Sequence, residues 1–151
     1  MNLEVWTRFG FDDQDLSLVP FHNFSPVLKS LRVVTKSLPR SRTLELVCSF
    51  PLLKDLCVED MESRGDQDQN DFQPSTSPPF TGTLELLQGR MERTSRLLLS
   101  LPNGFHFQKL KCRWEIEENV SWTNALVEAC SNTLECVDLQ VWNSASLQLF
   151  R

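Results

Sequence analysis

Two histidines, His22 and His106, are the residues of this sequence best suited to proton transfer. Imidazole is the usual general base because its pKa lies near neutral pH, and such a base needs a nucleophile and an orienting group beside it. Each histidine directly precedes an expected strand, in PFHNFSP and NGFHFQK, which is typical of a packing role in a turn. The sequence contains no GxSxG, GxxxxGK[ST], GxGxxG or HExxH motif. We therefore predict that the chain is not an enzyme, with a small α/β enzyme as an alternative.

Metal ligands are also present, but their spacing fits no metal site. The five cysteines include no CxxC pair, and Cys130 and Cys136 are separated by an expected helix end and a turn. The segment 66–70, DQDQN, imitates the start of an EF-hand loop, yet Asp71 stands where that loop needs glycine and Ser77 where it needs glutamate. We predict no metal, no cofactor and reduced thiols among apolar neighbours.

Tryptophan and arginine are the residue types that most often dominate protein interfaces. Three tryptophans fall at or just past the ends of expected strands, where packing in the core is the commoner role and contact with a partner is the alternative. The expected partner-binding set is Trp6, Arg32, Arg113, Trp114 and Trp142. Arg90, Arg93 and Arg96 follow one another at intervals of three in an expected helix, which favours a solvated face over a nucleic-acid site.

The charge of the chain is concentrated in one segment. Residues 59–79 hold six acidic residues and one basic residue, so this segment carries the entire net charge of −5 and leaves the remainder neutral. A neutral body has no field to attract nucleic acid or an anionic membrane. Because the segment is rich in Asp, Gln, Ser and Pro, we expect an acidic, disordered insertion loop. No apolar run is long enough to span a bilayer and no secretory signal opens the sequence, so we expect an intracellular protein, cytoplasmic or nuclear.

The elements that position these residues repeat along the chain. In FSPVLKSLRV and FPLLKDLCV, which begin at Phe24 and Phe50, three apolar positions match at an offset of 25 residues. Alternation of apolar and polar residues predicts a strand in each copy. The further copies are FTGTLEL with Leu84 and Leu86, FQKLKCRW with Leu110 and Cys112, LECVDL with Val137 and Leu139, and a partial copy at Leu3 and Val5.

Helical patterns lie between the copies. We expect helices over Met91–Leu101 and Ser121–Cys130, and a weaker one over Ser41–Cys48. A strand and a short helix repeating every 25 to 28 residues fit the period of leucine-rich repeats. The predicted fold is therefore a single α/β domain over residues 1–151, an irregular leucine-rich-repeat-like solenoid. Short parallel strands line its concave side and short helices its convex side. An ordinary α/β domain is the alternative.

The repeats depart from the consensus L-x-x-L-x-L-x-x-N. The asparagine position is occupied by Lys36, Met61, Gly89, Glu115 and Trp142. We therefore expect uneven turns after the strands. Since the expected terminal units do not cover the ends of the core, we also expect marginal stability or self-association.

Five phrases carry a resemblance to a known family: FSPVLKSLRV, CSFPLLKDLCVED, PPFTGTLEL, RLLLSLPNGFHFQKLKCRW and WTNALVEACSNTLECVDL. Over roughly residues 21–140, their order and spacing resemble the repeat region of F-box/leucine-rich-repeat proteins of mushroom-forming fungi. The resemblance implies substrate recognition for a cullin-type ubiquitin ligase, with no catalytic residues. We expect no F-box in the chain, so the resemblance implies no adaptor-binding segment within these residues.

These observations together predict a protein-binding module with an unknown protein partner. A ubiquitin-ligase complex is the expected setting if the repeats are joined to an F-box. A stand-alone scaffold, or a degenerate paralogue without a ligase role, is the alternative.

Overall fold

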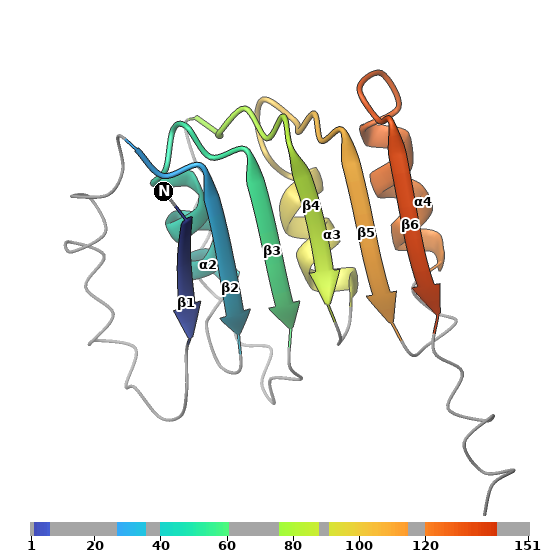
Figure 1. Ribbon diagram of the computed structural model, residues 1–151, viewed down its shortest axis with the longest axis horizontal. Coiled ribbons are helices and arrows are strands. Elements are labelled where there is room, and N and C mark those ends of the chain that lie inside the picture. The colour runs from blue at the N-terminus through green and yellow to red at the C-terminus, as the bar shows by residue number, and fades with distance from the viewer. Residues whose placement is uncertain are drawn as a thin grey trace, which may run out of the picture.

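The structure is a computed structural model, and it describes residues 2–6, 27–35, 40–60, 76–87, 91–114 and 120–141. The elements of these ranges are drawn in Figure 1. They are β1 (Asn2–Trp6), β2 (Ser30–Thr35), α2 (Arg40–Cys48), β3 (Asp55–Asp60), β4 (Thr83–Leu87), α3 (Met91–Leu99), β5 (Lys109–Trp114), α4 (Val120–Ala129) and β6 (Cys136–Val141).

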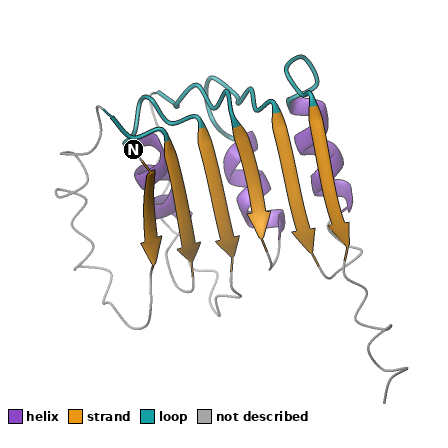
Figure 2. Cartoon of the chain, in the orientation of Figure 1, coloured by secondary structure: helices purple, strands orange, loops and turns teal. Residues whose placement is uncertain are grey.

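The strands form one six-stranded sheet in which the spatial order is the order along the chain, β1-β2-β3-β4-β5-β6. Every pair of neighbours is parallel, so each pair needs a crossover connection. Crossovers of one handedness that always add the next strand on the same side must all lie on the same face. Figures 1 and 2 show this result, with α2, α3 and α4 behind the sheet. The α/β class and the parallel strands predicted from the sequence are confirmed.

The register of the strands confirms the repeats. Leu31 pairs with Leu56 and Val33 pairs with Val58, which are the positions matched in the sequence. Two rows of apolar residues therefore cross the whole sheet. One row contains Leu3, Leu31, Leu56, Leu84, Leu110 and Val137, and the other contains Val5, Val33, Val58, Leu86, Cys112 and Leu139.

The helices have nearly the expected bounds. α2 begins at Arg40 and α4 at Val120, each one residue earlier than expected. α3 ends at Leu99, two residues earlier than expected, and Leu101 is buried in the turn that follows. α3 contacts both α2 and α4, so the helix layer is continuous although residues 76–82 of the β3–β4 connection contain no helix.

A layer of phenylalanines lies at the amino-terminal ends of the strands. Phe50, Phe80 and Phe107 are fully buried, and the ring centroids of Phe80 and Phe107 are 5.1 Å apart. Phe80 reaches this layer from a backbone with φ of 44°, a region that costs a residue with a Cβ roughly 1–2 kcal/mol. Burial of the aromatic ring offsets that cost.

The turns that enter the strands are joined by a ladder of backbone hydrogen bonds. The amides of Lys54 and Asp55 both donate to the carbonyl of Lys29, at 2.9 and 3.0 Å. The same arrangement recurs two strands further along, where Gln108 and Lys109 donate to Gly82, and again where Glu135 and Cys136 donate to Gln108. This ladder satisfies the turn backbone without side-chain amides. The five positions at which the repeat consensus has asparagine all follow the strands, and they lie outside the described residues.

The expected acidic insertion lies mostly outside the described residues. β3 runs to Asp60, so Glu59 and Asp60 are strand residues that pair with Val34 and Thr35. Residues 61–75 are not described, and Pro78 is buried before β4. Within the described ranges, no helix has the length and apolar content needed to cross a membrane.

Candidate functional site

The front face of the sheet is the face opposite the helices. Side chains alternate between the two faces of a strand, so the residues between the buried apolar rows point forward. Its members on β2 to β6 are Ser30, Arg32, Val34, Asp55, Cys57, Glu59, Thr83, Glu85, Leu87, Lys109, Lys111, Arg113, Cys136, Asp138 and Gln140. Most of them are polar or charged, which is the pattern of a solvated or partner-binding surface.

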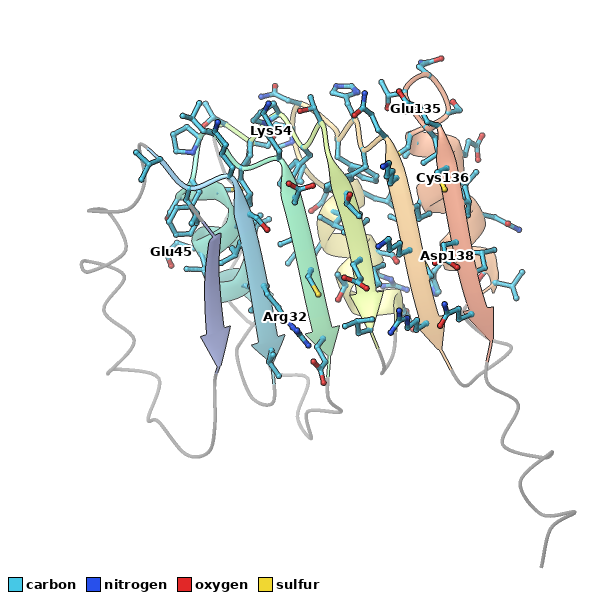
Figure 3. The ribbon with its side chains drawn as sticks, viewed as in Figure 1. Arg32, Glu45, Lys54, Glu135, Cys136 and Asp138 are labelled. Atoms are coloured by element: carbon cyan, nitrogen blue, oxygen red, sulfur yellow. The ribbon has the colours of Figure 1, made fainter. Side chains whose placement is uncertain are left out.

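One row across the front face contains charges of both signs. Two of its members, Arg32 on β2 and Asp138 on β6, are labelled in Figure 3. The register places these residues side by side: Arg32, Cys57, Glu85, Lys111 and Asp138. Opposite charges on neighbouring strands attract, so Lys111 between Glu85 and Asp138 favours the observed register.

The acidic side chains of β3 and β4 already have partners within the chain. Glu59 accepts a hydrogen bond and ion pair from Arg32 at 3.2 Å, with the Glu59 side chain only 15% exposed. One carboxylate oxygen of Asp55 accepts the backbone amide of Thr83 at 2.7 Å. Glu85 accepts a hydrogen bond from the thiol of Cys57. This half of the front face is therefore engaged in internal contacts.

Cys57 lies among these charges, between Arg32 and Glu85 in the register. The pKa of its thiol is raised to about 11, chiefly by burial and also by the carboxylates of Glu85 and Glu59, while Arg32 opposes the rise. Reactive cysteines need a lowered pKa, because the thiolate is the nucleophile. Cys57 is held protonated at neutral pH, so its environment is that of a structural thiol.

The basic side chains of β5 differ from these acids. Lys109, Lys111 and Arg113 point forward from one strand, because the alternate residues Leu110 and Cys112 are fully buried. None of the three side chains forms a hydrogen bond or an ion pair with another described residue. We call Lys109, Lys111 and Arg113 the basic column.

Exposure of the front face increases towards β6. Val34 on β2 is buried, and Cys57, Glu59 and Glu85 are half-buried. Lys109 and Arg113 are exposed, as are Cys136, Asp138 and Gln140 on β6. The accessible part of the face is therefore the part that contains the basic column.

The helix side of β6 is unusually exposed. Val137 is 41% exposed and Leu139 is 48% exposed, whereas their register partners Leu110 and Cys112 are fully buried. The two apolar rows of the core thus reach solvent at the last described strand.

The expected basic helix edge is only partly described. Arg96 forms an ion pair with Glu92 at 2.7 Å, and its guanidinium carbon lies 5.3 Å from the ring centroid of Trp122. This contact ties α3 to α4. Arg90 and the side chain of Arg93 lie outside the description.

The residues of the expected partner-binding set occupy different places. Arg32 and Arg113 both lie on the front face, three strands apart in the sheet. Trp6 ends β1 and pairs with Val34, and Trp114 ends β5 and pairs with Val141; neither side chain is described. Trp142 lies outside the described residues, so their binding role stays a prediction.

The described histidine and cysteines that could serve catalysis or metal binding do not lie together. His106 is exposed in the turn before β5, and His22 lies outside the description. Cys130 is buried at the end of α4, while Cys136 points forward from β6. In the described ranges no group of three or more His, Cys, Asp or Glu side chains is arranged to hold a metal ion. The calcium-like segment 66–70 is not described.

Sequence reasoning missed most of the basic column and its neighbours. It selected Arg113 but not Lys109 or Lys111, and it gave no role to Glu85 or Asp138. The signal was available, because the polar residue between the two apolar positions of each copy is by alternation a front-face residue.

Comparisons with known proteins assign no family to this arrangement. No family model, no curated protein and no solved structure matches the chain.

Proposed function

We propose that this chain is a protein-binding module, an irregular leucine-rich-repeat-like solenoid that holds its partner on the front face. The observation that supports this most is that the two faces of the sheet carry different kinds of side chain. The helix side carries the apolar core, whereas the front face presents aligned charged side chains that become more exposed towards β6. Charged residues in a fixed register on a rigid sheet suit recognition of a partner.

The curved shape of a solenoid is expected because strands and helices pack at different distances. Neighbouring strands lie ~4.8 Å apart, whereas packed helices need about 8–10 Å. A sheet with helices on one side therefore bends with its strands on the inside of the curve. The front face becomes the concave side, the surface that solenoid proteins use for binding.

The resemblance to F-box/leucine-rich-repeat proteins supports a more specific role. In that role the front face recognises a substrate, and a linked or associated F-box brings it to a cullin-type ubiquitin ligase. A stand-alone scaffold is the competing role, and it uses the same face without degradation of the partner. Deletion of the gene should lengthen the half-life of the bound protein in the ligase role and leave it unchanged in the scaffold role.

Site-specific photocrosslinking tests the choice of face. A photoreactive amino acid replaces Gln140 on the front face or, as the matched control, Glu128 on the exposed side of α4. We expect a discrete crosslinked partner from position 140 and none from position 128. Crosslinks from position 128 alone would overturn the assignment of the face, and crosslinks from neither position would overturn the binding function.

A further inference from the structure

We propose that the basic column binds an extended acidic protein segment whose carboxylates are spaced to match Lys109 and Arg113, with a non-acidic side chain between them. This inference rests on the proposed function, because it names the partner chemistry of the same face.

The acids and bases of the front face are satisfied to different degrees. Glu59, Asp55 and Glu85 have internal partners in Arg32, the Thr83 amide and the Cys57 thiol. The basic column makes no hydrogen bond or ion pair with the described residues. Asp138, the remaining acid of the face on β2 to β6, also lacks a hydrogen bond or ion pair with the described residues. The three cations of the basic column outnumber this one acid, so the charge without an internal partner is net positive and attracts a negatively charged partner.

The residues beside the basic column determine which of its positions can accept a negatively charged group. Lys109 lies beside Thr83 on β4 and Cys136 on β6, and neither neighbour is an acidic or basic residue. Arg113 lies beside Leu87 and Gln140, which are neutral as well. Both ends of the column therefore present a net positive charge.

The centre of the column is different. Lys111 is half-buried between Glu85 and Asp138 at the same level of the sheet. Two carboxylates flank one ammonium group there, so a third carboxylate from a partner meets net repulsion. A neutral side chain that donates a hydrogen bond fits this level better.

The spacing translates this charge pattern into a sequence pattern. Lys109 and Arg113 are four residues apart on a strand, which corresponds to roughly 13 Å. An extended partner running along β5 places its residues i and i+4 over these two cations and residue i+2 over Lys111. The pattern is acidic at i and i+4 and non-acidic at i+2. A nucleic-acid backbone fits poorly, because its phosphates form an unbroken row of charge.

Three blocked peptides of equal length test the pattern by titration into the isotope-labelled chain, followed by amide chemical shifts. The first has glutamate at i and i+4 and serine at i+2, the second has glutamate at all three positions, and the third has glutamate only at i+2. We expect the first to bind most tightly and the third most weakly, with the largest shifts on β5. Binding should weaken as salt is added, since exposed charges are screened.

Charge-removing variants locate the contact. Lys109→Gln and Arg113→Gln should each weaken binding of the first peptide roughly two- to fivefold, as expected for exposed ion pairs. Lys54→Gln is the matched control, because Lys54 is an exposed cation in the turn before β3, outside the column. It should leave the affinity unchanged. Circular dichroism of each variant confirms that the fold is retained.

Three outcomes would overturn the inference. The first is equal affinity for all three peptides, the second is equal weakening by Lys54→Gln, and the third is tighter binding of a single-stranded oligonucleotide of matched charge. If a partner still crosslinks at position 140 after any of these results, the proposed function stands and only the acidic pattern fails. If no crosslink forms either, the proposed function fails with it.

Discussion

The carboxylate of Asp55 on β3 closes the space where a side chain at Gly82 would stand. A Cβ built on Gly82 would lie 2.9 Å from Cγ of Asp55 and closer still to its Oδ1. The same carboxylate accepts the amide of Thr83 at 2.7 Å, and the carbonyl of Gly82 accepts two backbone amides from the next turn. Crowding at this point therefore affects both the β3–β4 pairing and the turn ladder.

Gly82→Ala should lower the free energy of unfolding by about 1–3 kcal/mol, as overpacking usually does. Urea denaturation of single and double variants measures the effect. The double variant Asp55→Ala with Gly82→Ala should lose less than the sum of the two single losses, because the clash is removed with the carboxylate. Gly104→Ala is the control, since nothing lies within 4 Å of its Cβ position and its cost comes from its φ of 64°. Additive losses for Asp55 and Gly82 would contradict the steric explanation.

Phe107→Ala should cost about 3–5 kcal/mol of unfolding free energy, the usual range for a buried phenylalanine. Phe107 is fully buried against both Phe80 and Phe105, with centroid distances of 5.1 and 5.7 Å. Phe107→Leu, which keeps most of the volume, should cost less. A loss below that of an exposed-site control such as His106→Ala would show that the phenylalanine layer does not stabilise the fold.

Ser95→Ala should raise the free energy of unfolding by about 1 kcal/mol, because it removes a buried hydroxyl that lacks a hydrogen bond. Ser95 on α3 is fully buried and its Oγ has no partner in the described residues. Ser100→Ala is the matched control, since the Ser100 hydroxyl donates to the carbonyl of Leu97 at 2.7 Å and its loss should be slightly destabilising. Thermal unfolding of the two variants should show shifts of opposite sign.

The stability of the chain should fall as the pH rises above 9. Burial raises the pKa of Cys112 to about 12, and that of Cys48 to about 11, from an ordinary value of 9.0. The folded state keeps these protons while the unfolded state releases them, so stability is full below pH 9 and is lost between pH 9 and 12. Denaturation at successive pH values should show a smaller slope for Cys112→Ala than for the natural chain. Equal slopes would show that this thiol does not contribute.

Val137→Ser should change the stability of the monomer little, by about 0.5 kcal/mol or less, since Val137 is 41% exposed. Leu110→Ala at the paired position should cost about 2–5 kcal/mol, because Leu110 is fully buried.

If the natural chain self-associates as its sequence predicts, Leu139→Glu should reduce that association, because Leu139 extends the same apolar surface. Light scattering over a range of concentrations measures this effect. Natural chain that stays monomeric throughout would contradict the expectation.

The repeats were predictable from the sequence because alternation and a regular offset are local signals. Leu31 and Leu56 were matched by spacing alone, and the structure pairs them. The positive φ of Phe80 and the closeness of Asp55 to Gly82 were not predictable, because they depend on how one turn lies against the next. The basic column needed a further step: Lys109, Lys111 and Arg113 become distinctive only once the acids of β3 and β4 are known to have partners within the chain.

Among the described residues, each strand pairs only with the strands that precede and follow it in the chain. A segment that contains one strand and its crossover can therefore be duplicated or lost by recombination without changing how the remaining strands pair. Such an event would add or remove one column of front-face side chains at a time. This architecture allows a lineage to lengthen, shorten or reorder its recognition surface while the core chemistry of each unit stays the same.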